Sequence, residues 1–265
     1  EVKLIFQPGE EKLPGGASLM IKEGLFDQST PTGIIAQHVY PNLPAGHVGF
    51  RGGLYMASAD EIYITILGKG GHAATPHLAI DPILIASKVV VGLQEIISRR
   101  TDPMSSAVLT IGKMNSDGGA TNVIPDRVFL EGTLRAMDED WRYKAHQMIT
   151  DFVNHTCQAA GATAEINIEI GYPSLKNDET LTEFCMNAAY QFLGQDKVHV
   201  MPPRMSSEDF AFYTHSAPGT FYRLGTGWDD PSKNNPVHSN RFNIDESALA
   251  TGMGLMAFIA ISRLS

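Results

Sequence analysis

The sequence contains little cysteine, no long apolar run and no excess of basic residues. Its two cysteines, Cys157 and Cys185, do not form the closely spaced pair of a zinc site or redox motif, and they are interpreted as buried thiols in a reducing compartment. The net charge of −9 argues against nucleic acid or an anionic membrane as a partner. The longest apolar run, residues 253–261, is too short to cross a membrane. With no signal peptide visible, these absences predict a cytoplasmic protein without nucleic-acid or membrane partners.

An initiator methionine is also missing, and the chain opens directly on a strand-like pattern in residues 2–6. We therefore expect a short strand there and a further segment upstream of Glu1. The 265 residues are enough for one large domain or two ordinary ones. Hydrophobic residues make up 43%, so the chain can bury a sizeable core without disulfides.

Periodicity in residues 58–171 predicts the order strand, helix, strand, strand, helix, strand. Residues 60–67 alternate between isoleucine and other residues, as a half-buried strand does. Asp81 and Asp138 stand where they would cap the two helices. This order is the split βαβ, or ferredoxin-like, arrangement. The segment is interpreted as a complete small domain inserted into an α/β domain made of residues 1–57 and 172–265.

Two adjacent carboxylates, Glu10 and Glu11, follow the strand-like start in a turn that contains Pro8 and Gly9. Open α/β folds place their ligands at the carboxyl ends of strands, where this turn would lie. Adjacent side chains diverge, so one carboxylate can bind a metal ion while the other transfers a proton. A solvated turn is the alternative for a Glu-Glu pair taken alone.

Histidines stand in three contexts that allow a chemical role. His38 closes an apolar strand, His238 lies in a loop before the C-terminal helix, and His72 is flanked by glycines after the first strand of the inserted domain. Carboxylate and imidazole together suit zinc and similar ions, and glycines let the backbone approach a ligand. Each could equally be an ordinary core, edge or turn histidine, because their separation excludes any argument from spacing.

Asn122 and Arg135 are further candidates within the inserted domain. Arg135 ends a predicted strand, and its guanidinium fork is suited to both oxygens of a substrate carboxylate. A surface salt bridge is the alternative role for this arginine.

Several short motifs occur in one order along the chain and together carry a resemblance. They are Gln-Pro-Gly-Glu-Glu, Gln-His-Val, Gly-Gly-His-Ala-Ala, Asn-Val-Ile-Pro, Glu-Gly-Thr-Leu-Arg, Ser-Glu-Asp-Phe and Val-His-Ser-Asn-Arg-Phe. From end to end the chain resembles the metal-dependent N-acyl-amino-acid amidohydrolases, which include aminoacylases, hippurate hydrolases, indoleacetyl-amino-acid hydrolases and related carboxypeptidases. The resemblance implies a two-metal, aminopeptidase-like α/β catalytic domain with an inserted ferredoxin-like lid that forms a homodimer.

The resemblance also implies a reaction, which is hydrolysis of the amide bond of N-acyl amino acids or similar small amides by metal-bound hydroxide. Glu10 would be the general base and acid. Glu11, His38 and His238 would be ligands of divalent metal ions, two in the intact enzyme, with zinc, manganese, cobalt and nickel all suited to such a site.

The remaining roles implied by the resemblance fall to the lid. His72, typically from the lid of the other subunit, would stabilise the oxyanion of the tetrahedral intermediate. Asn122 and Arg135 would hold the carbonyl and the carboxylate of the substrate. Such interactions strengthen as negative charge develops during the reaction.

Two departures from the family pattern stand out. The Cys-Gly-His-Asp segment that supplies further metal ligands is absent, so this chain carries three expected ligands and would hold one ion or none. An inactive fragment folded around an intact lid is therefore the alternative function. The smaller departure is Ser206-Ser207 before Glu208-Asp209, where relatives often have glycine, which puts the pocket wall and specificity in question.

Overall fold

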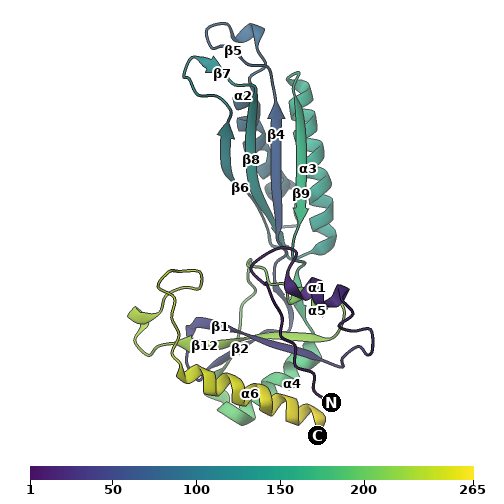
Figure 1. The fold of residues 1–265 in the computed structure, drawn as a ribbon, viewed down its shortest axis with the longest axis vertical. Coiled ribbons are helices and arrows are strands. Elements are labelled where there is room, and N and C mark those ends of the chain that lie inside the picture. The colour runs from purple at the N-terminus through teal and green to yellow at the C-terminus, as the bar shows by residue number, and fades with distance from the viewer. The chain divides into compact units, whose positions relative to one another are not determined.

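The computed structural model describes the backbone of residues 1–265 and every side chain except that of Pro231. The chain forms two compact units, both of mixed α/β structure, which confirms the predicted fold class. The first unit comprises Glu1–Met56, Leu175–Arg204 and Glu208–Ser265, and the second comprises Ala57–Ser174 and Met205–Ser207. In Figure 1 the colour follows the chain from purple at the N-terminus to yellow at the C-terminus.

The first unit is built on a mixed sheet. Its strands are β1 (Ile34–Pro44), β2 (Val48–Phe50), β3 (Gly53–Met56), β10 (Leu175–Asn177), β11 (Val198–Val200) and β12 (Gly219–Gly227). The main sheet has the order β1-β12-β2-β11, with β12 buried along its whole length. β12 pairs in parallel with β1, and this register places Arg223 opposite His38. β3 and β10 form a separate antiparallel pair.

Helices lie on both faces of this sheet (Figure 1). They are α1 (Gly16–Lys22), α4 (Glu179–Leu193), α5 (Ala211–Thr214) and α6 (Ser247–Leu264), with short 3-10 turns at η2 (Gln195–Lys197) and η3 (Pro231–Lys233). One face meets α4 and α6 in a core that includes the stacked rings of Phe50 and Tyr222. The other face meets α1 and α5, where Phe210 and Phe221 pack together. Helices α1 and α5 are therefore both packed on the same face of the sheet.

The C-terminal helix α6 is longer than the apolar run noted in the sequence. By length and composition alone, its 18 residues would also suit a membrane-spanning helix. Leu255 and Ile259 are nevertheless fully buried against the sheet and α4, as in the core helix of a globular unit. Asp245 lies one residue before the N-cap residue Glu246, and its carboxylate accepts a hydrogen bond from the amide of Ser247, the first residue of the helix.

The strand predicted for residues 2–6 is wrong, because these residues form no regular secondary structure. Leu4 is 74% exposed and Phe6 is 86% exposed. A strand is held by hydrogen bonds to a neighbouring strand, and apolar alternation alone does not supply that neighbour. The segment thus has strand composition without a pairing partner among the described residues.

The second unit is a four-stranded antiparallel sheet with two helices. Its elements are β4 (Asp60–Leu67), β5 (Gly71–His72), η1 (Pro76–Leu78), α2 (Pro82–Arg100), β6 (Ala107–Ser116), β7 (Val123–Ile124), β8 (Arg127–Ala136), α3 (Glu139–Ala159) and β9 (Thr163–Ile170). The strand order is β6-β8-β4-β9, which is the split βαβ topology. The carboxylates of Asp81 and Asp138 accept hydrogen bonds from the first turns of α2 and α3, as expected for N-caps. β5 and β7 form a separate two-stranded sheet.

A buried ionic network lies at the start of β4. Asp60 accepts hydrogen bonds from Arg142 and from the amide of Gly171, and His146 Nε2 lies 2.7 Å from its second oxygen. Arg142 also donates to Glu139 at 2.9 Å. Burial alone would raise the pKa of Asp60, but the hydrogen bonds from Arg142 and His146 outweigh it and lower that pKa to about 2. Each charge in this network therefore has an opposite partner.

Candidate metal and catalytic site

The loop that carries the Glu-Glu pair leaves the extended N-terminal segment and leads into α1. Gly9 adopts a positive φ of 60°, a backbone conformation that glycine reaches without a steric penalty. The turn after it places Glu10 partly inside the first unit, whereas the Glu11 side chain is 75% exposed. The two neighbouring carboxylates thus face different surroundings, as the sequence predicted.

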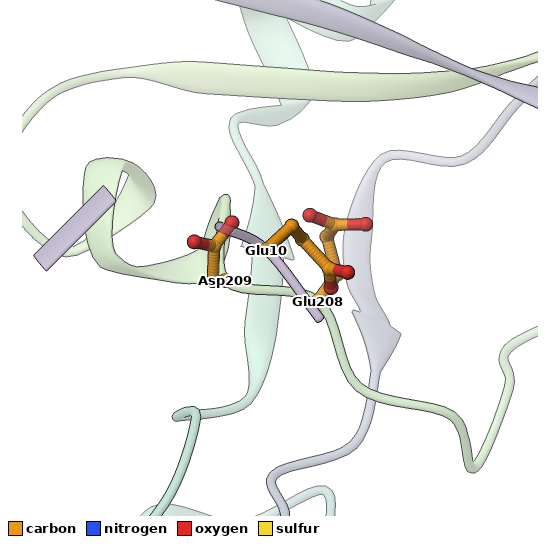
Figure 2. A group of neighbouring side chains, drawn as sticks. All are labelled: Glu10, Glu208 and Asp209. Carbon is orange, nitrogen blue, oxygen red and sulfur yellow. The ribbon is translucent and has the colours of Figure 1, made fainter. Parts of the chain in front are cut away.

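Three carboxylates of the first unit gather around this turn. Ligating oxygens of Glu10, Glu208 and Asp209 all lie within 4.8 Å of one another, and Figure 2 shows the three side chains together. Glu208 is 6% exposed and Asp209 is fully buried. Like charges this close repel one another unless a proton or a cation intervenes. The cluster is therefore a place where positive charge would be stabilised.

The pKa values in the cluster respond to this crowding. Burial raises the pKa of Glu10, and the charges of Asp209 and Glu11 raise it further. Burial also raises the pKa of Glu208, to about 8, and the nearby Glu10 adds to the effect. Carboxyl groups whose pKa values are raised by burial and by like charges are typical of sites of acid–base chemistry.

Glu11 and His238 come together from opposite ends of the chain. The Nδ1 atom of His238 lies 3.5 Å from Glu11 Oε1, and the His238 side chain is 68% exposed. His238 also has a positive φ of 65°, which is uncommon for a residue other than glycine. Strained backbone of this kind clusters at functional sites. The structure places Glu11 and His238, two of the metal ligands that the resemblance implies, next to each other.

His38 lies on β1 and is oriented by its own backbone. Its Nδ1 atom is 2.7 Å from the carbonyl oxygen of Val39. A carbonyl can only accept, so Nδ1 carries the proton and Nε2 keeps a free lone pair, as in metal-binding histidines. Burial lowers the pKa of His38, and Arg223 across the strand pair lowers it further. A neutral imidazole is the form that binds metal ions.

The expected ligands fit a divalent cation in donor type. They offer one carboxylate, from Glu11, and two imidazoles, from His38 and His238. The charge of His238 influences the pKa values of both His38 and Glu10, so these groups share one electrostatic neighbourhood. The closest set of ligating atoms in the described part of the chain is a different one, however, and consists of the three carboxylates around Glu10.

Glu208 and Asp209 were not assigned a role from the sequence. The motif Ser-Glu-Asp-Phe was noted for the resemblance only, and two adjacent acids give no local signal of burial. A usable signal was the apolar run that follows at residues 210–213, which is largely buried with α5. Acidic residues that enter such a run need a partner or a cation.

The three remaining candidates lie in the second unit. His72 is on β5, and its Nδ1 accepts a hydrogen bond from the Ala74 amide at 3.0 Å, so Nε2 carries the proton and can donate. The carbonyl of Asn122 accepts from the Ala73 amide at 2.9 Å. The structure thus brings the His72 and Asn122 segments together.

Arg135 lies apart from these two, on β8. One of its guanidinium nitrogens is 3.3 Å from the hydroxyl of Ser207 and 3.5 Å from the carbonyl oxygen of Met205. These are long contacts for hydrogen bonds, so they hold the guanidinium weakly. The contact with Ser207 is made by the serine hydroxyl, which a glycine at this position would lack.

Carboxylates and histidines gathered on an α/β scaffold define a candidate divalent-metal centre of a hydrolase. The chain belongs to peptidase family M20/M25/M40, whose family model matches residues 1–262. This membership confirms the family resemblance noted in the sequence.

Individual relatives are consistent with that family. The chain is 40% identical to a protein of Synechocystis named as the probable hydrolase sll0100, over 98% of this chain and 65% of the relative. It is 38% identical to an N-acetyl-L-cysteine deacetylase of Bacillus subtilis, over 94% of this chain and 57% of the relative. The crystal structure of the Bacillus subtilis YXEP protein, described as a dinuclear metal-binding peptidase of the M20 family, superposes with a TM-score of 0.77 at 30% identity, covering 98% of this chain and 64% of that one. The chain thus spans less than two thirds of the length of these relatives.

Proposed function

We propose that the protein hydrolyses the amide bond between an acyl group and an amino acid, in a reaction that depends on divalent metal ions. The observation that carries this proposal is the meeting of Glu11 with His238 at 3.5 Å, beside Glu10, whose pKa responds to both of them. Membership of peptidase family M20/M25/M40 supports hydrolysis as the reaction. The similarity to an N-acetyl-L-cysteine deacetylase supports N-acyl amino acids as the substrate class.

Glu11, His38 and His238 are the residues that would hold a metal ion. A divalent cation bound there would make water a better nucleophile and polarise the carbonyl of the substrate. The mixture of carboxylate oxygen and imidazole nitrogen suits zinc, manganese, cobalt and nickel. The hydrogen bond from Nδ1 of His38 to the carbonyl of Val39 would fix the orientation of the ring and leave Nε2 available to the metal ion.

Glu10 is the proposed general base and acid. Its carboxylate would accept a proton from the attacking water and deliver it to the nitrogen of the leaving amino acid. Burial and the neighbouring Asp209 and Glu11 raise its pKa above the ordinary value of a glutamate. A raised pKa makes the ionised carboxylate a stronger base for the proton of the attacking water.

His72, Asn122 and Arg135 are proposed to act on the substrate from the second unit. The Nε2–H of His72 would donate to the developing oxyanion, Asn122 would hold the carbonyl oxygen, and Arg135 would bind the substrate carboxylate in a fork. The weak contacts of Arg135 with Ser207 and Met205 leave donors for a carboxylate. A homodimer in which His72 serves the other subunit belongs to the same proposal.

The first test is metal binding and hydrolysis by the 265-residue chain. Titration with Zn²⁺ and Mn²⁺ should show binding, and a panel of N-acetyl amino acids should be hydrolysed. The variant Glu10→Gln should keep its metal affinity within about threefold and lose about 10² to 10⁴ in turnover, as expected for removal of a general base. Glu95→Gln, an exposed position on α2, is the matched control and should behave as the native chain does. Full turnover in Glu10→Gln would remove Glu10 as the base.

The second test separates a role within one chain from a role across a dimer. His72→Ala and Glu10→Gln are each expected to be nearly inactive. Mixing the two should restore part of the activity, because one composite site would then hold an intact Glu10 and an intact His72. No recovery in mixtures that form mixed dimers would restrict His72 to its own chain.

Arg135→Ala should raise the Michaelis constant only for substrates with a free carboxylate.

A further inference from the structure

Asp209 binds both ends of the loop that carries the proposed base. The Nε2 atom of Gln7 donates to both oxygens of the Asp209 carboxylate, at 2.7 and 2.8 Å. The backbone amide of Ala17, in the first turn of α1, donates to Oδ2 of the same carboxylate at 3.1 Å. One buried side chain therefore closes residues 7–17 into a loop whose ends are fixed side by side.

The two ends of this loop also touch directly. A Cβ atom at Gly16 would lie 1.6 Å from the carbonyl oxygen of Pro8, so only glycine allows this approach. Inside the loop, the amide of Gly15 donates to the carbonyl of Lys12 at 2.9 Å. The turn that carries Glu10 and Glu11 thus lies between two loop ends that are held together.

Asp209 is itself held by the core of the first unit. The residue that follows it, Phe210, is 3% exposed and packs on Phe221 of the central strand β12. The carbonyl of Asp209 accepts from the amide of Phe212 at 2.9 Å as α5 begins. A carboxylate anchored in this way gives the loop a fixed reference on the sheet.

We propose that Asp209 is a positioning residue: through Gln7 and the Ala17 amide it fixes the loop of residues 7–17 and so sets the placement of Glu10 and Glu11. This inference rests on the proposed function for the roles of those two glutamates. Asp209 neither contacts substrate nor binds metal in this proposal. It acts through the loop, as outer hydrogen-bond partners of metal ligands do.

The contacts require an acceptor at position 209. Gln7 Nε2 and the Ala17 amide are both donors, and an ionised carboxylate offers acceptors only. In Asp209→Asn the amide group of the new side chain would meet the donors of Gln7. Because the contact is partly buried, a donor that faces a donor weakens the bond of Gln7, which loosens the loop.

A double variant in which the donor and the acceptor of this hydrogen bond change places should restore the contact. In the double variant Gln7→Glu with Asp209→Asn, the new carboxylate at position 7 can accept from the amide at position 209. The remaining amide oxygen can still accept from Ala17. The double variant also keeps the net charge of the native chain. Thr182→Val is the structural control, since it removes a buried hydroxyl pair with Thr220 in the same unit without touching the loop.

Hydrogen exchange of residues 9–15 is the direct measurement. Asp209→Asn should speed exchange of these amides about tenfold, because the loop opens locally, while the amides of β12 keep their native rates. The double variant should return the loop to near its native rate, and Thr182→Val should leave the loop unchanged. Equal loop exchange in Asp209→Asn and Thr182→Val, or no recovery in the double variant, would overturn the proposal.

Metal affinity is the second measurement on the same four proteins, with Zn²⁺ and Mn²⁺ as probes. Asp209→Asn should weaken binding about tenfold, in the range found for outer partners of metal ligands, and the double variant should recover it. Unchanged affinity beside a loosened loop would overturn the positioning role. Should the native chain bind neither ion, the proposed function fails, and hydrogen exchange alone then decides whether Asp209 fixes the loop.

Discussion

Buried carboxylates occur in both units, but their surroundings are opposite. Asp60 in the second unit is matched by Arg142 and His146, and its pKa falls to about 2. Glu208 in the first unit lies beside two more carboxylates; burial raises its pKa to about 8, and the nearby Glu10 adds to the effect. A network of opposite charges stabilises the fold, whereas a cluster of like charges stores repulsion that a cation or a proton relieves. The contrast separates a structural use of buried charge from a chemical one.

The largest effect is expected from breaking the matched network. Arg142→Met would leave Asp60 buried without its main partner, which should cost about 3–5 kcal/mol of the free energy of unfolding. Denaturant titration measures this loss. The double variant Asp60→Asn with Arg142→Met should recover much of it, because no uncompensated charge remains. A loss below about 1 kcal/mol in the single variant would mean that the pair contributes little.

Cations should stabilise the first unit only. Adding Zn²⁺ or Mn²⁺ at 100 times its dissociation constant should raise the free energy of unfolding of the first unit by about 2.7 kcal/mol. Hydrogen exchange should slow around residues 7–17 and His238. The amides around Asp60 should exchange at their former rates. Equal protection of both units would contradict the contrast, because it would mean that the metal is not bound by the first unit alone.

Acid should weaken the matched network. A carboxyl group whose pKa is lower in the folded state contributes stability above its unfolded pKa, and this contribution is lost as the pH falls through the folded pKa. For Asp60 the loss should run from about pH 4 down to about pH 2 and amount to about 2 kcal/mol. Unfolding of native chain and Asp60→Asn across this range gives the comparison. A parallel pH dependence in the two proteins would remove Asp60 as the cause.

The smallest effect is expected at Glu208 when it is measured at pH 4. Its pKa is higher in the folded state, to about 8, so stability should fall as the pH rises from about 4.5 to 8. Glu208→Gln resembles the protonated carboxyl and keeps an oxygen for the Phe210 amide. We expect it to change the free energy of unfolding by less than about 1 kcal/mol at pH 4, where the native carboxyl is protonated in both states, and to make the metal-free chain more stable than native at pH 7 and above. A variant less stable than native at pH 9 would contradict the raised pKa.

Much of the second unit could be predicted because its signals are local. The alternation in residues 60–67 and the caps at Asp81 and Asp138 each act within a few residues, and all three appear in the structure. Strand composition in residues 2–6 gave a wrong prediction, since pairing depends on a neighbour that composition does not reveal.

The residues of the site also fall into those with a local sequence signal and those without one. Glu10 and Glu11 were found through a short motif, and the contact of Glu11 with His238 joins residues that the motifs had named. Asp209 and its bond to Gln7 could not be predicted, because that contact joins positions 202 residues apart and has no sequence signature. The second unit shows a similar limit, since the contact of Arg135 with Ser207 depends on how residues 205–207 return to it.

The pairing of β1 with β12 has a consequence for how the chain is made. Ile34 lies opposite Gly219, and the whole of β4 to β9 is synthesised between them. A ribosome releases β1 long before its parallel partner exists, while each strand of the second unit meets its neighbours within that one stretch. Contacts close in sequence form faster than distant ones, and chains fold as they emerge. During translation the second unit can therefore mature before β12 is released to pair with β1.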